Sequence, residues 1–145
     1  MTFRFEALLH LRKNTEQQEQ REMARRQQHL SARRSELEDL KASGAHHRAG
    51  LQSRLAQAID GRTLALYSPY LESLSTRSGS YETIITESEK QVESKRQELI
   101  EAMTKRRALE ILKERELLKK KQQAHKEEIA FADEMAATRW QRKGA

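Results

Sequence analysis

The chain has 145 residues, of which 34% are charged, 36% hydrophobic and 5% aromatic, so it lacks the apolar volume for a large compact core. It contains no cysteine, which excludes disulfides and thiolate metal sites. The net charge of +6 is mixed with acidic residues throughout, whereas a DNA-binding region gathers its basic residues in one stretch. One proline, five glycines and abundant Glu, Gln, Lys, Arg, Leu and Ala favour long helices over disorder.

Nothing in the sequence indicates a membrane segment or a secretory leader. The opening Met1–Glu6 has no uninterrupted apolar stretch of the signal-peptide type. No segment approaches the roughly 20 apolar residues that a membrane-spanning helix needs. We therefore expect a cytoplasmic protein.

The first half of the chain repeats apolar residues at intervals of seven. Glu16 and Gly44 interrupt this ladder, and the positions four residues after each rung are polar from Lys13 to Arg48. The pattern predicts a helix over about residues 3–58 whose apolar seam is thin and which needs a partner helix. The ladder consists of Leu9, Glu16, Met23, Leu30, Leu37, Gly44, Leu51, Ala58 and Ala65.

The second half alternates apolar spacings of three and four residues, which is a stronger coiled-coil pattern. Its seam consists of Leu71, Leu74, Tyr81, Ile85, Val92, Leu99, Ala102 and Leu109, with polar rungs at Ser78, Ser88, Lys95 and Arg106. The stripe then continues on a displaced register through Ile111, Leu118, His125, Ile129, Ala132 and Ala136. Such a displacement either changes the supercoil locally or ends tight pairing, so we expect the stretch beyond about Leu112 to pair less regularly.

Gly61 and Pro69 separate the two patterns. Proline is tolerated in the first turn of a helix, so we predict a loop over about 59–67 and a second helix over about 68–140 with Ser68 as its N-cap. Long helices joined by a short connection fold back on each other. The predicted fold is an all-α, long two-helix antiparallel coiled-coil hairpin that forms a single elongated unit over 1–145, with a monomer expected in isolation.

The residues needed for catalysis are missing. A two-helix rod offers no cleft, and the sequence has no glycine-rich phosphate-binding loop. His46 and His47 are adjacent and diverge on a helix, and the other histidines are isolated, so a metal site is not expected. We predict that the chain is not an enzyme and has no cofactor, no metal and no catalytic residues.

Two groups of apolar residues exceed what the heptads require. Phe3 and Phe5 at the start and Phe131 and Trp140 at the finish are expected to meet in an antiparallel hairpin. Either Phe5 and Phe131 plug the open end of the coil, or Phe3, Met135 and Trp140 form a docking end. Seven residues near the loop are too many for one seam, so part of that group is expected to be exposed and to bind a partner. They are Leu64, Leu66, Tyr67, Tyr70, Leu71, Leu74 and Tyr81. The basic run from Lys113 to Lys121 is either a solvated face or a contact for an acidic surface.

Motifs along the whole chain resemble the FliJ family, the small coiled-coil component of the bacterial flagellar type III export apparatus. The most specific stretch runs from Lys95-Arg96 through Glu101-Ala102 to Lys113-Glu114-Arg115. Pro69 and the polar rungs of the first helix depart from the family pattern. The other matching stretches are Phe3-Arg4-Phe5 with Leu8-Leu9 and Leu11-Arg12, Ser68-Pro69-Tyr70-Leu71 with Leu74, Glu127-Glu128, and Asp133-Glu134-Met135-Ala136 with Arg139.

The resemblance implies a stalk-like role without catalysis. Members of this family enter the hexameric ring of the export ATPase FliI, contact the export gate protein FlhA and assist the export chaperones. By position, the ring contact would fall on Phe3, Phe5, Met135, Arg139 and Trp140. The gate contact would fall on Leu40, His47, Tyr70, Leu74 and Tyr81. The implied location is the cytoplasmic face of the inner membrane, in peripheral association with the export apparatus.

Two other readings stay open on the sequence alone. The equivalent stalk of a virulence type III secretion system has a similar pattern. A basic helical nucleic-acid binder is the other candidate, and it predicts that binding falls steeply with added salt.

Overall fold

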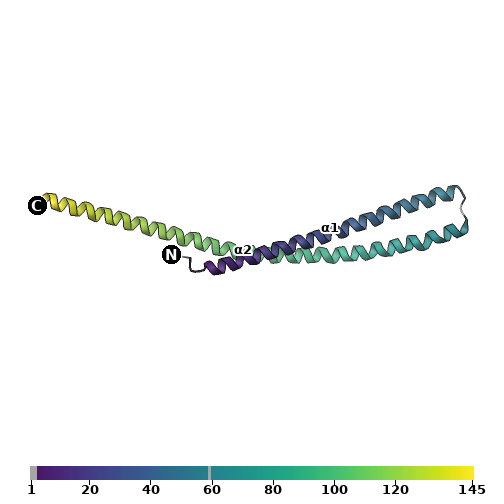
Figure 1. Cartoon of the computed structure of the whole chain (residues 1–145), viewed down its shortest axis with the longest axis horizontal. Coiled ribbons are helices and arrows are strands. Elements are labelled where there is room, and N and C mark those ends of the chain that lie inside the picture. Colours follow the sequence, from purple (N-terminus) through teal and green to yellow (C-terminus); the bar gives the residue numbers. More distant parts are fainter. Residues whose placement is uncertain (1–2, 59) are drawn as a thin grey trace. The chain divides into compact units, whose positions relative to one another are not determined.

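A computed structural model describes residues 3–58 and 60–145 of the chain. Two helices make up the fold: α1 (Glu6–Ala56), of 51 residues, and α2 (Gly61–Gly144), of 84 residues, which pack against each other as a hairpin (Figure 1). The predicted all-helical hairpin is confirmed. Contacts divide the chain into two units, Met1–Glu16 with Glu101–Ala145 and Gln17–Ile100, so a single elongated unit stays a prediction.

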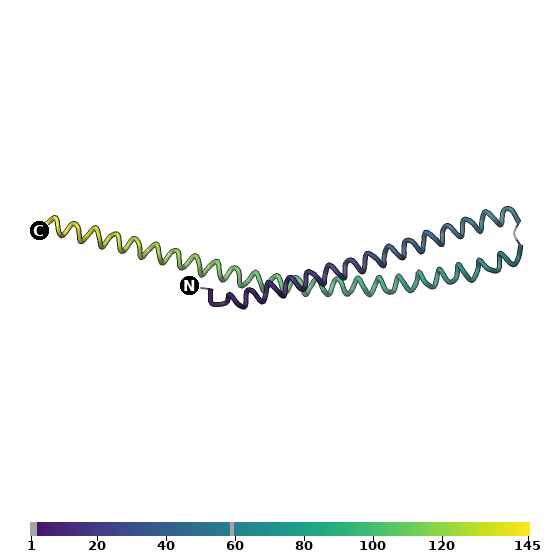
Figure 2. The backbone as a smooth tube through the Cα atoms, in the orientation of Figure 1, coloured from purple at the N-terminus to yellow at the C-terminus, as the bar shows by residue number. Residues whose placement is uncertain are grey.

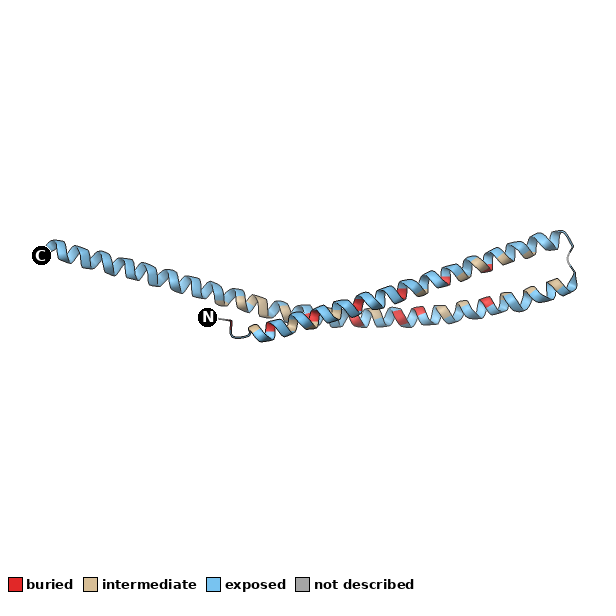
Figure 3. Cartoon of the chain, in the orientation of Figure 1, coloured by how far each residue is buried: buried red, intermediate tan, exposed pale blue. Residues whose placement is uncertain are grey.

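The seam of the Gln17–Ile100 unit is built from the residues that the heptads indicate. Its buried apolar side chains are Met23, Leu30 and Leu37 from α1 and Leu74 and Ile85 from α2 (Figure 3). Tyr81 and Val92 pack, partly buried, against the cluster of Leu30, Leu37 and Ile85. Because seven residues bring a helix back to nearly the same face, this spacing places one row of side chains on each helix toward the other.

The second row of α1 residues in the seam lies three residues after each rung of the ladder, not four residues after it. Arg12, Glu19, Arg33, Leu40 and His47 are half-buried there, while Lys13, Gln20 and Arg34 are exposed. Arg12 and Arg33 of this row can cover the seam with their methylene groups while their charged ends reach water. The seam therefore buries more apolar area than the number of apolar residues in it suggests.

Ion pairs across the seam follow the antiparallel direction. Arg34 pairs with Glu89 at 2.7 Å and Lys41 with Glu82 at 3.2 Å, so a step of seven residues up α1 matches a step of seven down α2. Exposed pairs of this kind contribute at most about 1 kcal/mol each. Their value here is that they repeat the same register.

Lys95 occupies a seam position and is only 8% exposed. Its ammonium nitrogen lies 2.7 Å from Glu19 and 2.8 Å from Glu22, both on α1, and 2.8 Å from Glu98 on its own helix. Hydrogen bonds to these carboxylates raise the pKa of Lys95 above its ordinary value. In return, Lys95 lowers the pKa values of Glu22 and Glu98. The two α1 carboxylates bonded to this buried cation fix the register of the two helices at this point.

The connection between the helices is shorter than predicted. The helix α2 begins at Gly61, so the expected start at 68 with Ser68 as N-cap is wrong, as is a loop over 59–67. Asp60 begins the helix instead, because its carbonyl accepts from the Leu64 N–H at 3.1 Å and its carboxylate lies 3.5 Å from the Arg62 N–H. Ala58 ends the turn after α1 with a φ of 60°, a conformation that glycine adopts more easily.

Pro69 therefore sits inside α2 rather than in its first turn. Proline has no N–H, so the usual helical bond to the Ala65 carbonyl cannot form. Both residues are exposed, which lets water hydrate that carbonyl. The exposure explains why the helix continues through the proline.

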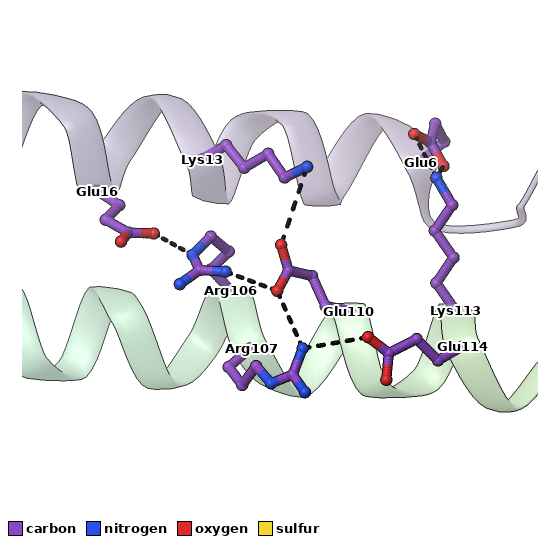
Figure 4. A network of polar contacts seen from close by, with 8 residues as sticks. All are labelled: Glu6, Lys13, Glu16, Arg106, Arg107, Glu110, Lys113 and Glu114. Carbon is purple, nitrogen blue, oxygen red and sulfur yellow. Dashed lines mark hydrogen bonds and ion pairs between the residues drawn. The ribbon is translucent and has the colours of Figure 1, made fainter.

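In the Met1–Glu16 with Glu101–Ala145 unit, the start of α1 packs against the middle of α2. Leu9 is 2% exposed, and Phe3 and Ala102 are also buried. Glu16 receives a hydrogen bond from Arg106, which also donates to Glu110 at 2.6 Å (Figure 4). Polar residues thus take over the seam where the apolar ladder is interrupted.

This polar network continues to the N-terminal end of α1. Lys13 lies 3.9 Å from Glu110, and Lys113 donates to Glu6 at 2.8 Å (Figure 4). The bond from Lys113 lowers the pKa of Glu6, and the bond from Arg106 lowers that of Glu110. Glu6 therefore faces Lys113, which leaves the last part of α2 beyond the start of α1 (Figure 2).

The C-terminal segment of α2, residues 117–145, is exposed at every position (Figure 3). Half-buried residues of α2 extend to Glu116, four residues after the position where regular pairing was expected to stop. Pairing ends here because α1 begins at Glu6, which bonds Lys113. The apolar stripe after Leu109 also turns away from α1. The prediction that the stretch beyond about Leu112 pairs less regularly is confirmed.

Candidate partner-binding surfaces

The five residues assigned to the gate contact by resemblance lie on facing stretches of the hairpin. The ring of His47 on α1 meets the ring of Tyr70 on α2 edge to face, with centroids 4.9 Å apart. Leu40 and Tyr81 are half-buried, whereas Leu74 is fully buried in the seam. Tyr70 is thus the best exposed of the five, and Leu74 supports the surface from beneath.

A shallow groove of about 390 Å³ lies beside these residues, and we call it the Gly44 groove. Gly44 creates it because the ladder position that would hold a leucine carries no side chain, and an added Cβ would lie 3.6 Å from Leu74 Cδ1. Two cations, Lys41 and Arg48, border the apolar floor. The groove is lined by Leu40, Lys41, Gly44, Arg48, Leu74, Ser75 and Ser78.

The aromatic group near the loop divides as expected between seam and surface. Leu71 and Tyr81 are half-buried and Leu74 is buried, while Leu66 is 74% exposed and Leu64 is exposed as well. Tyr67 is covered by the Arg54 guanidinium, whose carbon lies 5.9 Å from the ring centroid. Apolar side chains are therefore available to a partner at this end of the Gln17–Ile100 unit.

The residues assigned to the ring contact are not brought together. Phe3 is buried beside Phe5, with ring centroids 5.8 Å apart, and Glu6 just after them pairs with Lys113. Trp140 lies 27 residues further along α2, which corresponds to about 40 Å of helix. The expectation that both chain ends meet is wrong, because α2 outruns α1. Phe131 does not plug the open end of the coil either.

The C-terminal segment exposes large apolar side chains without covering them. Trp140 is 80% and Phe131 66% exposed, and Leu117, Leu118, Ile129 and Met135 are also exposed. A monomeric protein seldom leaves so many on one segment unless they meet another molecule. Arg139 is exposed between Met135 and Trp140, so the three predicted ring residues of α2 are all accessible.

Neither surface has the groups for catalysis. No set of three or more His, Cys, Asp or Glu side chains that could hold a metal occurs among residues 3–58 and 60–145. The carboxylates with shifted pKa values are all lowered by cationic partners, which keeps them ionised rather than poised for proton transfer. Within the described residues, neither helix is both long and apolar enough to cross a membrane.

Two helices that share a narrow seam and expose most of their remaining surface define a coiled-coil protein that acts through contacts with other proteins. The particular family follows from comparison with known sequences: the profile described as "Flagellar FliJ protein" matches residues 1–145, and the chain belongs to the FliJ family. No curated protein and no solved structure matches it.

Family membership makes the chain a non-enzymatic component of the flagellar export apparatus. It favours flagellar export over the virulence-type stalk and over the nucleic-acid binder that the sequence alone left open.

Proposed function

We propose that the chain is a stalk that joins the export ATPase FliI to the export gate protein FlhA. The observation that carries this proposal is the C-terminal segment, a single exposed helix that extends α2 beyond the paired region. It is about 40 Å long and about 10–12 Å wide with its side chains. A single helix fits a narrower opening than a helix pair does, which suits insertion into a ring.

The ring contact is assigned to Met135, Arg139 and Trp140. An exposed tryptophan beside a cation is a common centre of binding energy in protein interfaces. Phe3 and Phe5 are removed from this contact, since Phe3 is buried and both lie just before Glu6, which bonds Lys113 about 40 Å of helix before Trp140. Their role is to close the N-terminal end of the paired region.

The stalk would act on the ATPase by preferring some states of its subunits over others. A ligand shifts an equilibrium only as far as its affinities for the two states differ. The chain would thereby promote ring assembly and hydrolysis while carrying out no chemistry itself.

The test is stimulation of ATP hydrolysis by variants of the full chain. Met135→Ala combined with Trp140→Ala is expected to lower the affinity for the ATPase by about tenfold to a hundredfold, as loss of a hot spot does. Gln123→Ala combined with Gln141→Ala is the control, because it alters exposed polar residues of the same segment. Equal stimulation by both variants would refute the ring contact.

The gate contact is assigned to the Gly44 groove together with Tyr70 and His47. The groove supplies an apolar floor with two cations at its border, and the rings of Tyr70 and His47 extend it toward the loop. Leu40 and Leu74 line the groove, and Tyr81 packs against the core beside it. All five residues of the expected gate set thus belong to one stretch of the hairpin.

Gly44→Leu tests the groove without removing any partner of the seam. A leucine continues the ladder of Leu30, Leu37 and Leu51 and fills the groove, so the hairpin is expected to remain folded. Capture of the gate protein is expected to fall by about tenfold or more, as for blocking a central interface pocket. Leu66→Ala, an exposed site outside the groove, serves as the control. Full capture by Gly44→Leu with loss in Leu66→Ala would move the gate contact to the loop.

Chaperone handling and a cytoplasmic location at the inner membrane complete the proposal. Family membership and the exposed apolar residues Leu64 and Leu66 support the first. The absence of a spanning helix among the described residues is compatible with peripheral association. Capture of export chaperones by Leu64→Ala with Leu66→Ala, compared with the unaltered chain, tests whether this surface is used.

A further inference from the structure

The displaced apolar stripe of the C-terminal segment faces away from the paired region. Ile111 follows Ala102 by nine residues, and Leu118 follows Leu109 by nine, which is two and a half helical turns in each case. Ala102 is buried and Leu109 half-buried on the side toward α1. The stripe therefore lies on the opposite side of α2, where α1 does not obstruct a second helix.

The stripe keeps the spacing of a coiled-coil seam. Ile111, Leu118, Ile129, Ala132 and Ala136 recur at steps that combine three and four residues, with polar rungs at Arg115, Gln122 and His125. An isolated helical segment of this length is marginally stable in water. A partner helix would stabilise it.

The charges beside the stripe identify the occupant. Lys121 and Glu128 lie on one flank of it, each directly before a rung of the stripe. Neither of the two forms an ion pair within the described part of the chain, although other charges on α2 do. In an antiparallel pair of identical helices each flank meets the same flank of the other copy.

One antiparallel register satisfies both the charges and the apolar stripe. When Leu118 of one copy lies opposite Ile129 of the other, Ile111 lies opposite Ala136. In the same register Lys121 lies near Glu128 of the second copy. Twofold symmetry produces each of these contacts twice.

A shallow groove on the same face receives the end of the second copy. It has a volume of about 530 Å³ and is bordered by Met103, Thr104, Arg106, Arg107, Ala108 and Ile111. In the register above, Trp140 of the second copy lies opposite Arg107 and Ala108. Trp140 would then cover Met103 and Ile111, so the most exposed large side chain of the chain finds an apolar contact.

We propose that the C-terminal segment pairs antiparallel with that of a second copy of this chain, so that the protein forms a homodimer outside the export apparatus. This replaces the expectation of a monomer, which considered only the seam between α1 and α2. The dimer uses the helix that we assign to the ATPase ring, so binding of the ring and of the second copy exclude each other. The inference does not rest on the proposed function, because it concerns the chain by itself.

Sedimentation of the full chain at concentrations from about 1 µM to about 200 µM tests the proposal, since a small interface is expected to be weak. The mass is expected to rise from that of one chain to that of two, and the dissociation constant is expected to increase with salt. A mass of one chain throughout would overturn the proposal.

Charge reversal tests the register. Lys121→Glu places like charges against Glu128 at two symmetric sites and is expected to weaken dimerisation by about tenfold. Glu128→Lys is expected to do the same, and the combination of both is expected to restore the original affinity with the net charge unchanged. Lys90→Glu, at an exposed site in the other unit, is the control. A dimer that Lys121→Glu leaves intact, or that the combined variant fails to restore, would refute the register.

Cysteine variants test the antiparallel direction, since the natural chain has none. Leu118→Cys mixed with Ile129→Cys is expected to form a disulfide-linked heterodimer under mild oxidation. Each variant alone is expected to remain largely unlinked, because position 118 faces 129 and not another 118. Linking of Leu118→Cys with itself at the same yield would show a parallel pair and contradict the proposal.

Discussion

Replacing Gly44 with alanine is expected to stabilise the hairpin, although this glycine is buried between two helices. Alanine is favoured over glycine in a helix interior by about 0.8–1.0 kcal/mol. The added Cβ would lie 3.6 Å from Leu74 Cδ1, an ordinary van der Waals distance, so no atom has to move. Burial of one methyl group adds up to about 0.8 kcal/mol. The free energy of unfolding should rise by about 1–2 kcal/mol.

Gly79→Ala is the matched control for this measurement. A Cβ at Gly79 meets nothing within 4 Å, so this variant gains the helix propensity without the contact. Urea unfolding followed by far-ultraviolet circular dichroism gives both free energies, and their difference isolates the contact with Leu74. Destabilisation by Gly44→Ala alongside stabilisation by Gly79→Ala would show that the helices pack more closely at Gly44 than the structure has them.

Three further expectations concern stability. Leu37→Ala removes a buried seam residue and should cost about 2–3 kcal/mol in urea unfolding, while Leu117→Ala should change it by less than about 0.5 kcal/mol; equal losses would contradict the seam. Ala58→Gly relieves a φ of 60° in the turn and should raise the free energy of unfolding by about 0.5–1 kcal/mol in the same urea experiment; an unchanged or lower value would contradict this conformation. The pKa values of Glu22 and Glu98 are lowered in the fold, so both carboxylates stabilise it above the ordinary glutamate pKa of about 4.3. This stabilisation is lost as the pH falls through their lowered pKa values. A melting temperature that does not change between about pH 5 and pH 2 would refute this.

The seam could be predicted because burial in a coiled coil depends almost entirely on spacing. Leu30, Leu37, Leu74 and Ile85 are all buried where the heptads place them. Even the polar rung at Lys95 was correctly placed, but not its three carboxylate partners. The spacing fixes which face a residue occupies, whereas the ion pairs depend on the register between two helices far apart in sequence.

The start of α2 was missed because Pro69 was given more weight than Asp60. A proline disfavours a helix interior, but where its neighbours are exposed the cost is small enough for the helix to extend past it. The signal for the true start was present, since Asp60 is a strong N-cap residue directly before Gly61. An N-cap residue such as Asp60 is therefore a better marker of this helix start than the proline nine residues later.

The candidate sites illustrate the same limit. The expected gate residues lie on one stretch of the hairpin because an antiparallel register brings Leu40 and Tyr81 near each other, but their contact with the gate stays a prediction. The expected ring residues do not come together, because α2 extends beyond the start of α1. The predicted ranges of 3–58 and 68–140 already gave the second helix the greater length, so the overhang that holds Trp140 could have been inferred.

Hydrogen exchange of the chain with and without the export ATPase tests the central claim most directly. In the chain alone, at a concentration where it is monomeric, residues 117–145 are expected to exchange quickly and the seam near Leu30 and Ile85 slowly. Added ATPase is expected to protect 117–145 and leave the Gly44 groove unchanged. Protection at Leu40 and Tyr70 with none beyond residue 117 would contradict the claim that this segment enters the ring.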